Sequence, residues 1–367
     1  MTGFYQPVLF VTFAQIFWCF NALQEPTINE NDSGHDVRKA ELEAWLSRSA
    51  DGADVTLEAA SDDASFRRYF RLTTNGGTFI AMDAPPPQED CLPFVTVAGH
   101  LEAMQLNAPR VIEADLERGF LLLSDLGSMQ YLEALEADPR NADVLYEDAI
   151  NALVRMQQLG TAYQASLPPY DRALLERELA LFHDWLCGTH LGLDLSDDDE
   201  REWTRLCERL VRNALDQPQV FVHRDYHSRN LMVRSEANPG ILDFQDAVEG
   251  PLTYDLVSLL KDCYITWPVS AVDLRIRQFY AQLEPSLRER VDELQFRRYF
   301  ELMGVQRHLK AAGIFARLNH RDGKSRYLAD IPRTLAYITE LVPRYEELGW
   351  LGELIETRVL PGFGVNA

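Results

Sequence analysis

The chain has 367 residues and a formal net charge of −22, from 35 Lys and Arg against 57 Asp and Glu. With 46% hydrophobic and 25% charged residues, its composition is that of a soluble globular protein, which excludes the collagen-like, low-complexity and wholly disordered classes. The acidic excess repels nucleic-acid phosphates and anionic membrane surfaces, so we expect neither as a main partner.

The first 36 residues differ from the rest of the chain. Their apolar run, Val8 to Leu23, is interrupted by Gln15 and falls short of the roughly 20 residues that span a bilayer. No Lys or Arg precedes Arg38, so the basic region of a signal peptide is missing. We expect residues 1–36 to be a non-essential extension and the protein to have no integral membrane span. The alternative is that this extension makes a loose contact with a membrane surface or a partner. Five cysteines without a CxxC spacing favour reduced thiols and a cytoplasmic location.

From residue 37 the pattern becomes that of a folded domain. Asp36 is a suitable N-cap for a helix that runs to Leu46. The turn Asn75-Gly76-Gly77 separates two strand-like runs, and a Pro-rich breaker at residues 84–87 precedes the next helical run. The expected elements are a helix at 37–46, strands at 55–60, 66–73 and 78–82, a helix at 94–106 and a strand at 119–123.

Downstream of residue 125 the periodicity is mostly helical. The expected helices span residues 131–156, 172–186 and 197–215, and short strands are expected at 220–222, 231–233 and 240–242. The outline is an α+β protein of two lobes. A small β-rich lobe covers residues 37–125, and a larger, mainly helical lobe covers residues 126–367.

The residues suited to chemistry are concentrated between His223 and Asp255. Asp225 precedes Asn230 by five residues on a loop between two short strands, and the next strand ends at Asp243. Phosphoryl transfer needs such a set, because one carboxylate accepts the proton of the substrate hydroxyl while an amide and a second carboxylate hold Mg²⁺ against the ATP phosphates. The alternative is that these loop carboxylates only cap backbone amides.

Two segments, D-Y-H-x-x-N from Asp225 and D-F-x-x-A-x-x-G-P-x-x-Y-D-L from Asp243, resemble the aminoglycoside phosphotransferase and choline kinase group, which is related to the protein kinases. The resemblance implies a bilobal protein-kinase-like fold that binds ATP and Mg²⁺. It implies that Asp225 is the catalytic base and that Asn230 and Asp243 are the magnesium ligands. It also implies that His223 and Asp255 support the catalytic loop structurally.

The first lobe departs from the kinase pattern. It has no Gly-rich phosphate loop, and the lysine of the third strand is missing because no lysine occurs between positions 40 and 260. The ATP phosphates still need a cation. The candidates are Arg67, Arg68 and Arg71 with the hydroxyl of Ser65, and the alternative is that these arginines are only solvated. At the junction of the lobes, backbone groups at Ser124 and Leu126 are expected to meet the adenine edge.

The most basic part of this acidic chain lies between residues 301 and 333, where seven Lys and Arg face three acids. Such local positive charge suits an anionic substrate and argues against a polycationic aminoglycoside. We therefore predict that Arg307, Lys310 and Arg317 bind substrate. The alternative is helix surface charge that offsets acidic neighbours.

Four segments together resemble one subgroup of the family, namely 61–72 (SDDASFRRYFRL), 79–86 (FIAMDAPP), 119–127 (GFLLLSDLG) and 306–318 (QRHLKAAGIFARL). This subgroup phosphorylates the anomeric C1 hydroxyl of N-acetylmuramate and N-acetylglucosamine in bacterial cell-wall recycling. The resemblance implies an α-1-phosphate product, and the lactyl carboxylate of N-acetylmuramate would fit the basic stretch. We predict no obligate protein partner. A choline-like or homoserine-like kinase, or a nucleotide-binding pseudokinase, remains as an alternative.

Overall fold

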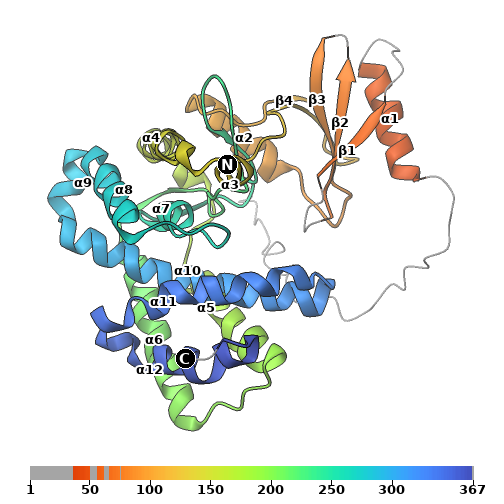
Figure 1. The fold of residues 1–367 in the computed structure, drawn as a ribbon. Coiled ribbons are helices and arrows are strands. Elements are labelled where there is room, and N and C mark those ends of the chain that lie inside the picture. The colour runs from red at the N-terminus through yellow and green to blue at the C-terminus, as the bar shows by residue number, and fades with distance from the viewer. Residues whose placement is uncertain (1–35, 50–55, 62–65, 75, 366–367) are drawn as a thin grey trace, which may run out of the picture.

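The computed structural model describes residues 36–49, 56–61, 66–74 and 76–365. The expected N-terminal extension, apart from Asp36, lies outside this part of the chain. A small antiparallel sheet flanked by helices forms one side of the molecule, and a larger group of helices forms the rest (Figure 1). This arrangement confirms the predicted α+β architecture of a small β-rich lobe and a large helical lobe. Within the described residues, no helix has the length and apolar character needed to cross a membrane.

The sheet of the first lobe has the antiparallel strand order β1-β2-β3-β5-β4. The strands are β1 Leu57–Ser61, β2 Arg68–Thr74, β3 Gly77–Asp83, β4 Val111–Asp115 and β5 Phe120–Ser124. Because side chains alternate along a strand, each face buries a separate set. Ala81 and Phe120 pack in the cluster of helix α1 (Val37–Ser49), whereas Met82 and Leu121 pack in the cluster of helix α2 (Leu92–Ala103).

Helix α1 is attached to the sheet by charged groups as well as by packing. The backbone N–H of Lys39 donates to Asp36 Oδ1 at 3.0 Å, which confirms the predicted N-cap. The carboxylate of Asp83, fully buried at the end of β3, lies 2.5 Å from an Arg38 nitrogen and 2.6 Å from an Arg68 nitrogen. Two guanidinium groups therefore compensate the burial of this single carboxylate.

The second lobe contains helices of very different lengths. They are α3 Tyr131–Ala137, α4 Ala142–Gly160, α5 Arg172–Leu181, α6 Asp197–Leu215, α7 Tyr254–Leu260, α8 Val269–Gln282, α9 Pro285–Arg290, α10 Glu293–Asp322, α11 Ile331–Thr339 and α12 Gly349–Leu354. Two strand pairs are β6 Gln219–Val222 with β9 Val248–Pro251, and β7 Leu231–Met232 with β8 Gly240–Ile241.

Several expected elements differ from the observed ones. The predicted helix 131–156 is wrong as a single helix, because a 3₁₀ turn at Pro139 separates α3 from α4 and proline cannot occupy a helix interior without loss of a hydrogen bond. The predicted helix 172–186 ends as α5 at Leu181 and continues as a π-helical segment, η3 (Phe182–His190). Strands β4 and β9 were not expected. The predicted helix 197–215 is confirmed as α6.

Helix α10 runs through the middle of the second lobe. Every residue from Glu301 to Lys310 is buried, so neighbouring elements surround this stretch on all sides. Those neighbours include α5, α6, α7, α11 and η3. A Cβ atom added at Gly313 would lie 2.3 Å from the backbone of Leu181, so only glycine permits this close crossing. The basic stretch 301–333 is thus partly interior rather than a continuous surface patch.

Candidate active site

Residues 223–230 form a loop between β6 and β7, and the buried carboxylate of Asp255 holds the start of this loop. The backbone N–H groups of His223 and Arg224 donate to Asp255 at 2.7 and 2.9 Å. Burial raises the pKa of Asp255 to about 7, and these two donors oppose that rise. Arg224 has a φ of 78°, which is rare for a residue other than glycine, so the contact holds the chain in an unfavourable bend beside Asp225.

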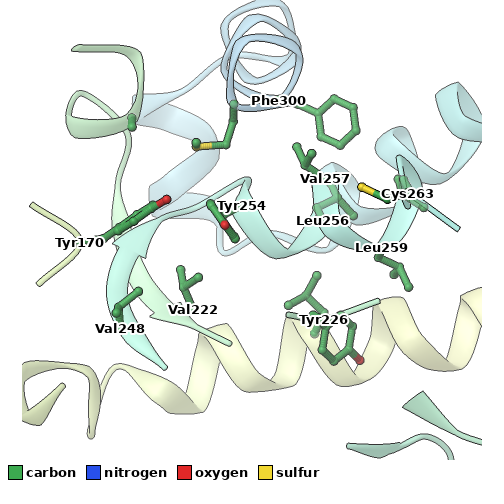
Figure 2. Packing of buried hydrophobic residues seen from close by; sticks show 14 of the residues in the cluster. Tyr170, Val222, Tyr226, Val248, Tyr254, Leu256, Val257, Leu259, Cys263 and Phe300 are labelled. Carbon is green, nitrogen blue, oxygen red and sulfur yellow. The ribbon is translucent and has the colours of Figure 1, made fainter. Parts of the chain in front are cut away.

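Two further side chains of the loop bond it to α4 and to the segment after α7. Tyr226 is fully buried on the α4 side of α7 (Figure 2), and its hydroxyl donates to the backbone oxygen of Ala149 at 2.9 Å. The N–H and the hydroxyl of Ser228 donate to the buried carboxylate of Asp262 at 3.0 and 2.6 Å. The loop is therefore fixed on both sides of Asp225, which remains partly exposed.

Asn230 and Asp243 lie next to each other, as a shared metal site requires. The side-chain nitrogen of Asn230 is 3.2 Å from Asp243 Oδ2 and 3.0 Å from the backbone oxygen of Asp225. Gln245 donates to the other carboxylate oxygen of Asp243 at 2.8 Å. Carboxylate and amide oxygens fit Mg²⁺, which usually takes one or two protein ligands and completes its shell with water and phosphate. The described residues contain no larger cluster of acidic, His or Cys ligands.

The carboxylate of Asp225 is ionised at neutral pH. Burial by itself would raise its pKa, but Lys310, His227, Arg224 and Arg307 outweigh that effect and lower the pKa to about 2. A carboxylate in this state can accept a proton from a substrate hydroxyl. The surrounding cations also offset the negative charge that nucleotide phosphates would bring to the same place.

Behind Asp225 lies a buried network that we call the Glu178 cluster: Glu178, Tyr170, Arg224, Gln306 and Lys310. The carboxylate of Glu178 is 2.5 Å from an Arg224 nitrogen and 2.9 Å from Lys310 Nζ. It also accepts hydrogen bonds from Tyr170 and, at 3.1 Å, from Gln306. Burial would raise the pKa of Glu178, but Lys310 and Arg224 lower it to about 2. One carboxylate therefore holds two cations that act on the candidate base.

The three predicted substrate residues, Arg307, Lys310 and Arg317, lie on one face of α10. Lys310 follows Arg307 by three residues and Arg317 follows Lys310 by seven, which are spacings that keep helix residues on the same side. Lys310 is buried, paired with Glu178, and donates to the Tyr254 hydroxyl at 3.0 Å. Arg307 is buried, with a guanidinium nitrogen 3.6 Å from Cys263 Sγ. Arg317 is partly exposed. Arg307 and Lys310 lie close enough to Asp225 to lower its pKa, so both belong to the surroundings of the loop 223–230.

The predicted phosphate-binding arginines are all engaged with carboxylates in this structure. Arg67 lies just before β2, 3.8 Å from Glu89. Arg68 bridges Asp83 and Asp36. Arg71 binds Asp125 with its Nε at 2.7 Å. Ser65 lies outside the described residues, so its predicted role stays a prediction.

Of the two residues predicted to meet the adenine edge, Leu126 keeps an available backbone donor. The N–H of Ser124 already donates to the backbone oxygen of Arg110 at 3.0 Å, so it is not available to an adenine edge. The N–H of Leu126 makes no hydrogen bond within the described part of the chain. A cavity of about 250 Å³ beside this junction is lined by residues of α2, the junction and the β7–β8 turn, including Glu102, Ser124, Leu126 and Arg234.

Several residues of the site were not found from the sequence. Glu178 lies in no motif, and Gln306 begins the segment 306–318 without a predicted role of its own; the importance of both residues arises from partners on distant elements. Asp262, which holds Ser228, follows α7 in a segment that was not singled out. The sequence pattern around Asp243 gives no signal for Glu178, Gln306 or Asp262, because contacts between residues far apart in the chain leave no regular spacing in the sequence.

Three comparisons place the chain among known proteins. The phosphotransferase enzyme family matches residues 56–294. The N-acetylmuramate/N-acetylglucosamine kinases of Pseudomonas aeruginosa and Pseudomonas putida are each 48% identical to the chain, over 87% and 88% of it and 96% of each relative. The kinase of the same name from Neisseria meningitidis is 42% identical over 87% of the chain and 95% of the relative.

Solved structures share the fold at low sequence identity. A choline kinase from Cryptosporidium parvum covers 85% of the chain and 98% of its own, with a TM-score of 0.55 and 11% identity. An ADP-bound aminoglycoside phosphotransferase, APH(2'')-Ib, covers 81% and 97%, with a TM-score of 0.53 and 14% identity. The two lobes thus have the protein-kinase-like arrangement that the sequence predicts, and the chain belongs to the phosphotransferase enzyme family.

Proposed function

We propose that the protein transfers the γ-phosphoryl group of ATP to the anomeric C1 hydroxyl of N-acetylmuramate and N-acetylglucosamine, giving the α-1-phosphate. The observation that carries this proposal is the meeting of Asp225, Asn230 and Asp243, in a chain 48% identical to kinases named for these two sugars. The product would re-enter the synthesis of cell-wall precursors, which agrees with the cytoplasmic location proposed from the sequence.

Each residue has a distinct task in the proposed reaction. Mg²⁺, when bound by Asn230 and Asp243, would neutralise the phosphate oxygens of ATP. Asp225, ionised because of its low pKa, accepts the proton of the C1 hydroxyl as the sugar oxygen bonds to the γ-phosphorus and the bond to ADP breaks. The anchors at Asp255 and Asp262 keep Asp225 in place, so little motion is needed at the moment of transfer.

A choline-like kinase receives less support from the structure. A quaternary ammonium is recognised by an aromatic cage, and the sequence left open whether Trp185, Trp203 and Trp267 form one. Trp267 donates to the Tyr146 hydroxyl at 2.6 Å and has the Arg275 guanidinium 5.8 Å from its ring. The Arg275 guanidinium at that distance would repel a quaternary ammonium bound at the Trp267 ring. Trp203 instead stacks on Phe182.

An ATP-consumption assay with Mg²⁺ tests the proposal and its alternatives together. We expect turnover with N-acetylmuramate and N-acetylglucosamine and none with choline or homoserine. ³¹P NMR of the product should show a phosphate coupled to the anomeric proton of an α-sugar. The absence of turnover with either amino sugar, while ATP still binds, would support the pseudokinase alternative and overturn the proposal.

A further inference from the structure

The catalytic loop carries a cation that the proposed mechanism does not use. Arg229 directly precedes Asn230 and is partly exposed. Its guanidinium carbon lies 3.7 Å from the centre of the Tyr264 ring and 5.9 Å from the centre of the Tyr327 ring. Within the described part of the chain it makes no hydrogen bond or ion pair, so these aromatic contacts leave its five N–H donors unused.

The other charged groups around Arg229 already have partners. Asp262 accepts from Ser228 and, at 2.9 Å, from the backbone N–H of Tyr264. Asp330 lies 3.5 Å from Arg333. Lys310 is paired with Glu178, and Arg307 has a guanidinium nitrogen 3.6 Å from Cys263 Sγ. A substrate carboxylate that reaches Arg229 would therefore displace no carboxylate partner, whereas at Lys310 it would compete with Glu178.

The surface under Arg229 is rigid. The backbone oxygen of Tyr264 accepts a hydrogen bond from Arg333 at 2.6 Å. The Tyr264 and His227 rings pack edge to face, with 5.4 Å between their centres. Tyr327 is stacked on Phe315 with 5.8 Å between ring centres. A guanidinium that lies 3.7 Å over a fixed ring loses little further freedom when it binds a ligand.

Arg229 and the candidate base also belong to one short, anchored segment. The N–H of His227 donates to the backbone oxygen of Asp225 at 3.1 Å, and the N–H of Asn230 donates to the backbone oxygen of His227 at 2.9 Å. Because His227 also packs against Tyr264, the base and the stacked arginine are held at a fixed separation.

We propose that Arg229, held against Tyr264, binds the carboxylate of the lactyl group of N-acetylmuramate while Asp225 receives the anomeric hydroxyl. This inference rests on the proposed function. A planar guanidinium binds a carboxylate through two parallel N–H···O bonds. N-acetylglucosamine has no such carboxylate, so Arg229 distinguishes the two sugars, a role that neither the family match nor the catalytic motif assigns.

Steady-state kinetics on both sugars test this role with the variants Arg229→Gln, Arg229→Lys and Arg326→Gln. Arg229→Gln should raise KM for N-acetylmuramate roughly 10- to 100-fold, at least tenfold more than it raises KM for N-acetylglucosamine. Arg229→Lys keeps the charge but cannot form two parallel N–H···O bonds, so its rise in KM for N-acetylmuramate should be intermediate. Arg326 is the matched control, because it is exposed and lies 5.1 Å from the same Tyr327 ring. Its replacement should change neither KM more than about twofold.

Each contrary pattern overturns the assignment. Equal rises in KM for the two sugars would mean a general loss of site geometry, and equal falls in kcat would mean contact with the phosphoryl group. An effect of Arg326→Gln as large as that of Arg229→Gln would mean a long-range charge effect. If the wild-type protein turns over neither sugar, the proposed function fails. Calorimetry would then compare the binding of N-acetylmuramate to the wild-type protein and to Arg229→Gln. Weaker binding to the variant supports the role of Arg229. Equal binding to both, or no binding to the wild-type protein, overturns it.

Discussion

Replacement of Glu178 by Gln should destabilise the protein far more than its small change in shape suggests. The substitution keeps the volume of the side chain but removes the negative charge that lies between Arg224 and Lys310. Both cations are largely buried, so each is left without its compensating charge in a medium that solvates it poorly. Breaking a buried pair in this way costs about 3–5 kcal/mol.

That cost can be read as a shift in melting temperature. A chain of this length has an unfolding entropy of roughly 0.8 kcal/mol/K, so Tm should fall by about 4–7 °C. Differential scanning calorimetry at pH 7 measures the shift directly. The matched control is Glu176→Gln on the same helix, because Glu176 is exposed and its 3.2 Å pair with Arg172 is a surface contact. That control should lower Tm by less than about 1 °C.

A double variant separates charge compensation from other effects. Glu178→Gln combined with Lys310→Met removes one of the two buried cations that have lost their carboxylate partner. The Tm of the double variant should therefore exceed that of Glu178→Gln alone. The reasoning would be refuted if Glu178→Gln lowered Tm no more than Glu176→Gln, or if the double variant were less stable than the single one. In either case the cluster would not depend on the charge of Glu178.

Other expectations concern the catalytic loop and acid stability. Asp225→Asn should lower kcat at least ~10²-fold while circular dichroism and ATP binding stay normal; turnover close to wild type would exclude it as the base. Because the pKa of Asp225 is lowered to about 2, kcat/KM should show no acid limb from this group above about pH 4, and a limb near pH 6 assigned to it would contradict the geometry. Asp243→Ala should abolish turnover at any Mg²⁺ concentration, whereas high Mg²⁺ should partly rescue Asn230→Ala; identical behaviour would argue against separate ligand roles. The lowered pKa of Glu178 contributes stability that is complete above its unfolded pKa of roughly 4.3 and is lost as pH falls toward about 2, so an acid melt of Glu178→Gln should lack that part of the transition.

The parts of the site that the sequence predicted are those with short spacing along the chain. Asp225 and Asn230 belong to one loop, and Asp243 comes two residues after β8, so local turns are enough to bring them together. The N-cap at Asp36 was predictable for the same reason, since its contact is with the third residue of α1. Patterns of this kind record local backbone geometry.

The parts that could not be predicted depend on distant pairing. Lys310 and Arg307 were chosen as substrate ligands because they lie in a basic stretch, but a count of charges along the chain does not reveal that Glu178 lies opposite Lys310. In the same way, Arg71 was a candidate for the phosphates, and the structure pairs it with Asp125. The split between α3 and α4 had a visible signal in Pro139, which the helical periodicity on both sides concealed.

The burial of residues 301–310 of α10 on all sides limits which changes of chain length the fold can accept. One residue inserted into this helix would rotate everything beyond it by about 100°. Lys310 would leave Glu178, and a residue with a side chain would replace Gly313 against the backbone of Leu181. At Gly323 the helix ends in a left-handed conformation with φ of 66°, and the chain is free to turn. Insertions and deletions among relatives should therefore gather after Gly323 and be absent from the stretch between Glu301 and Gly313.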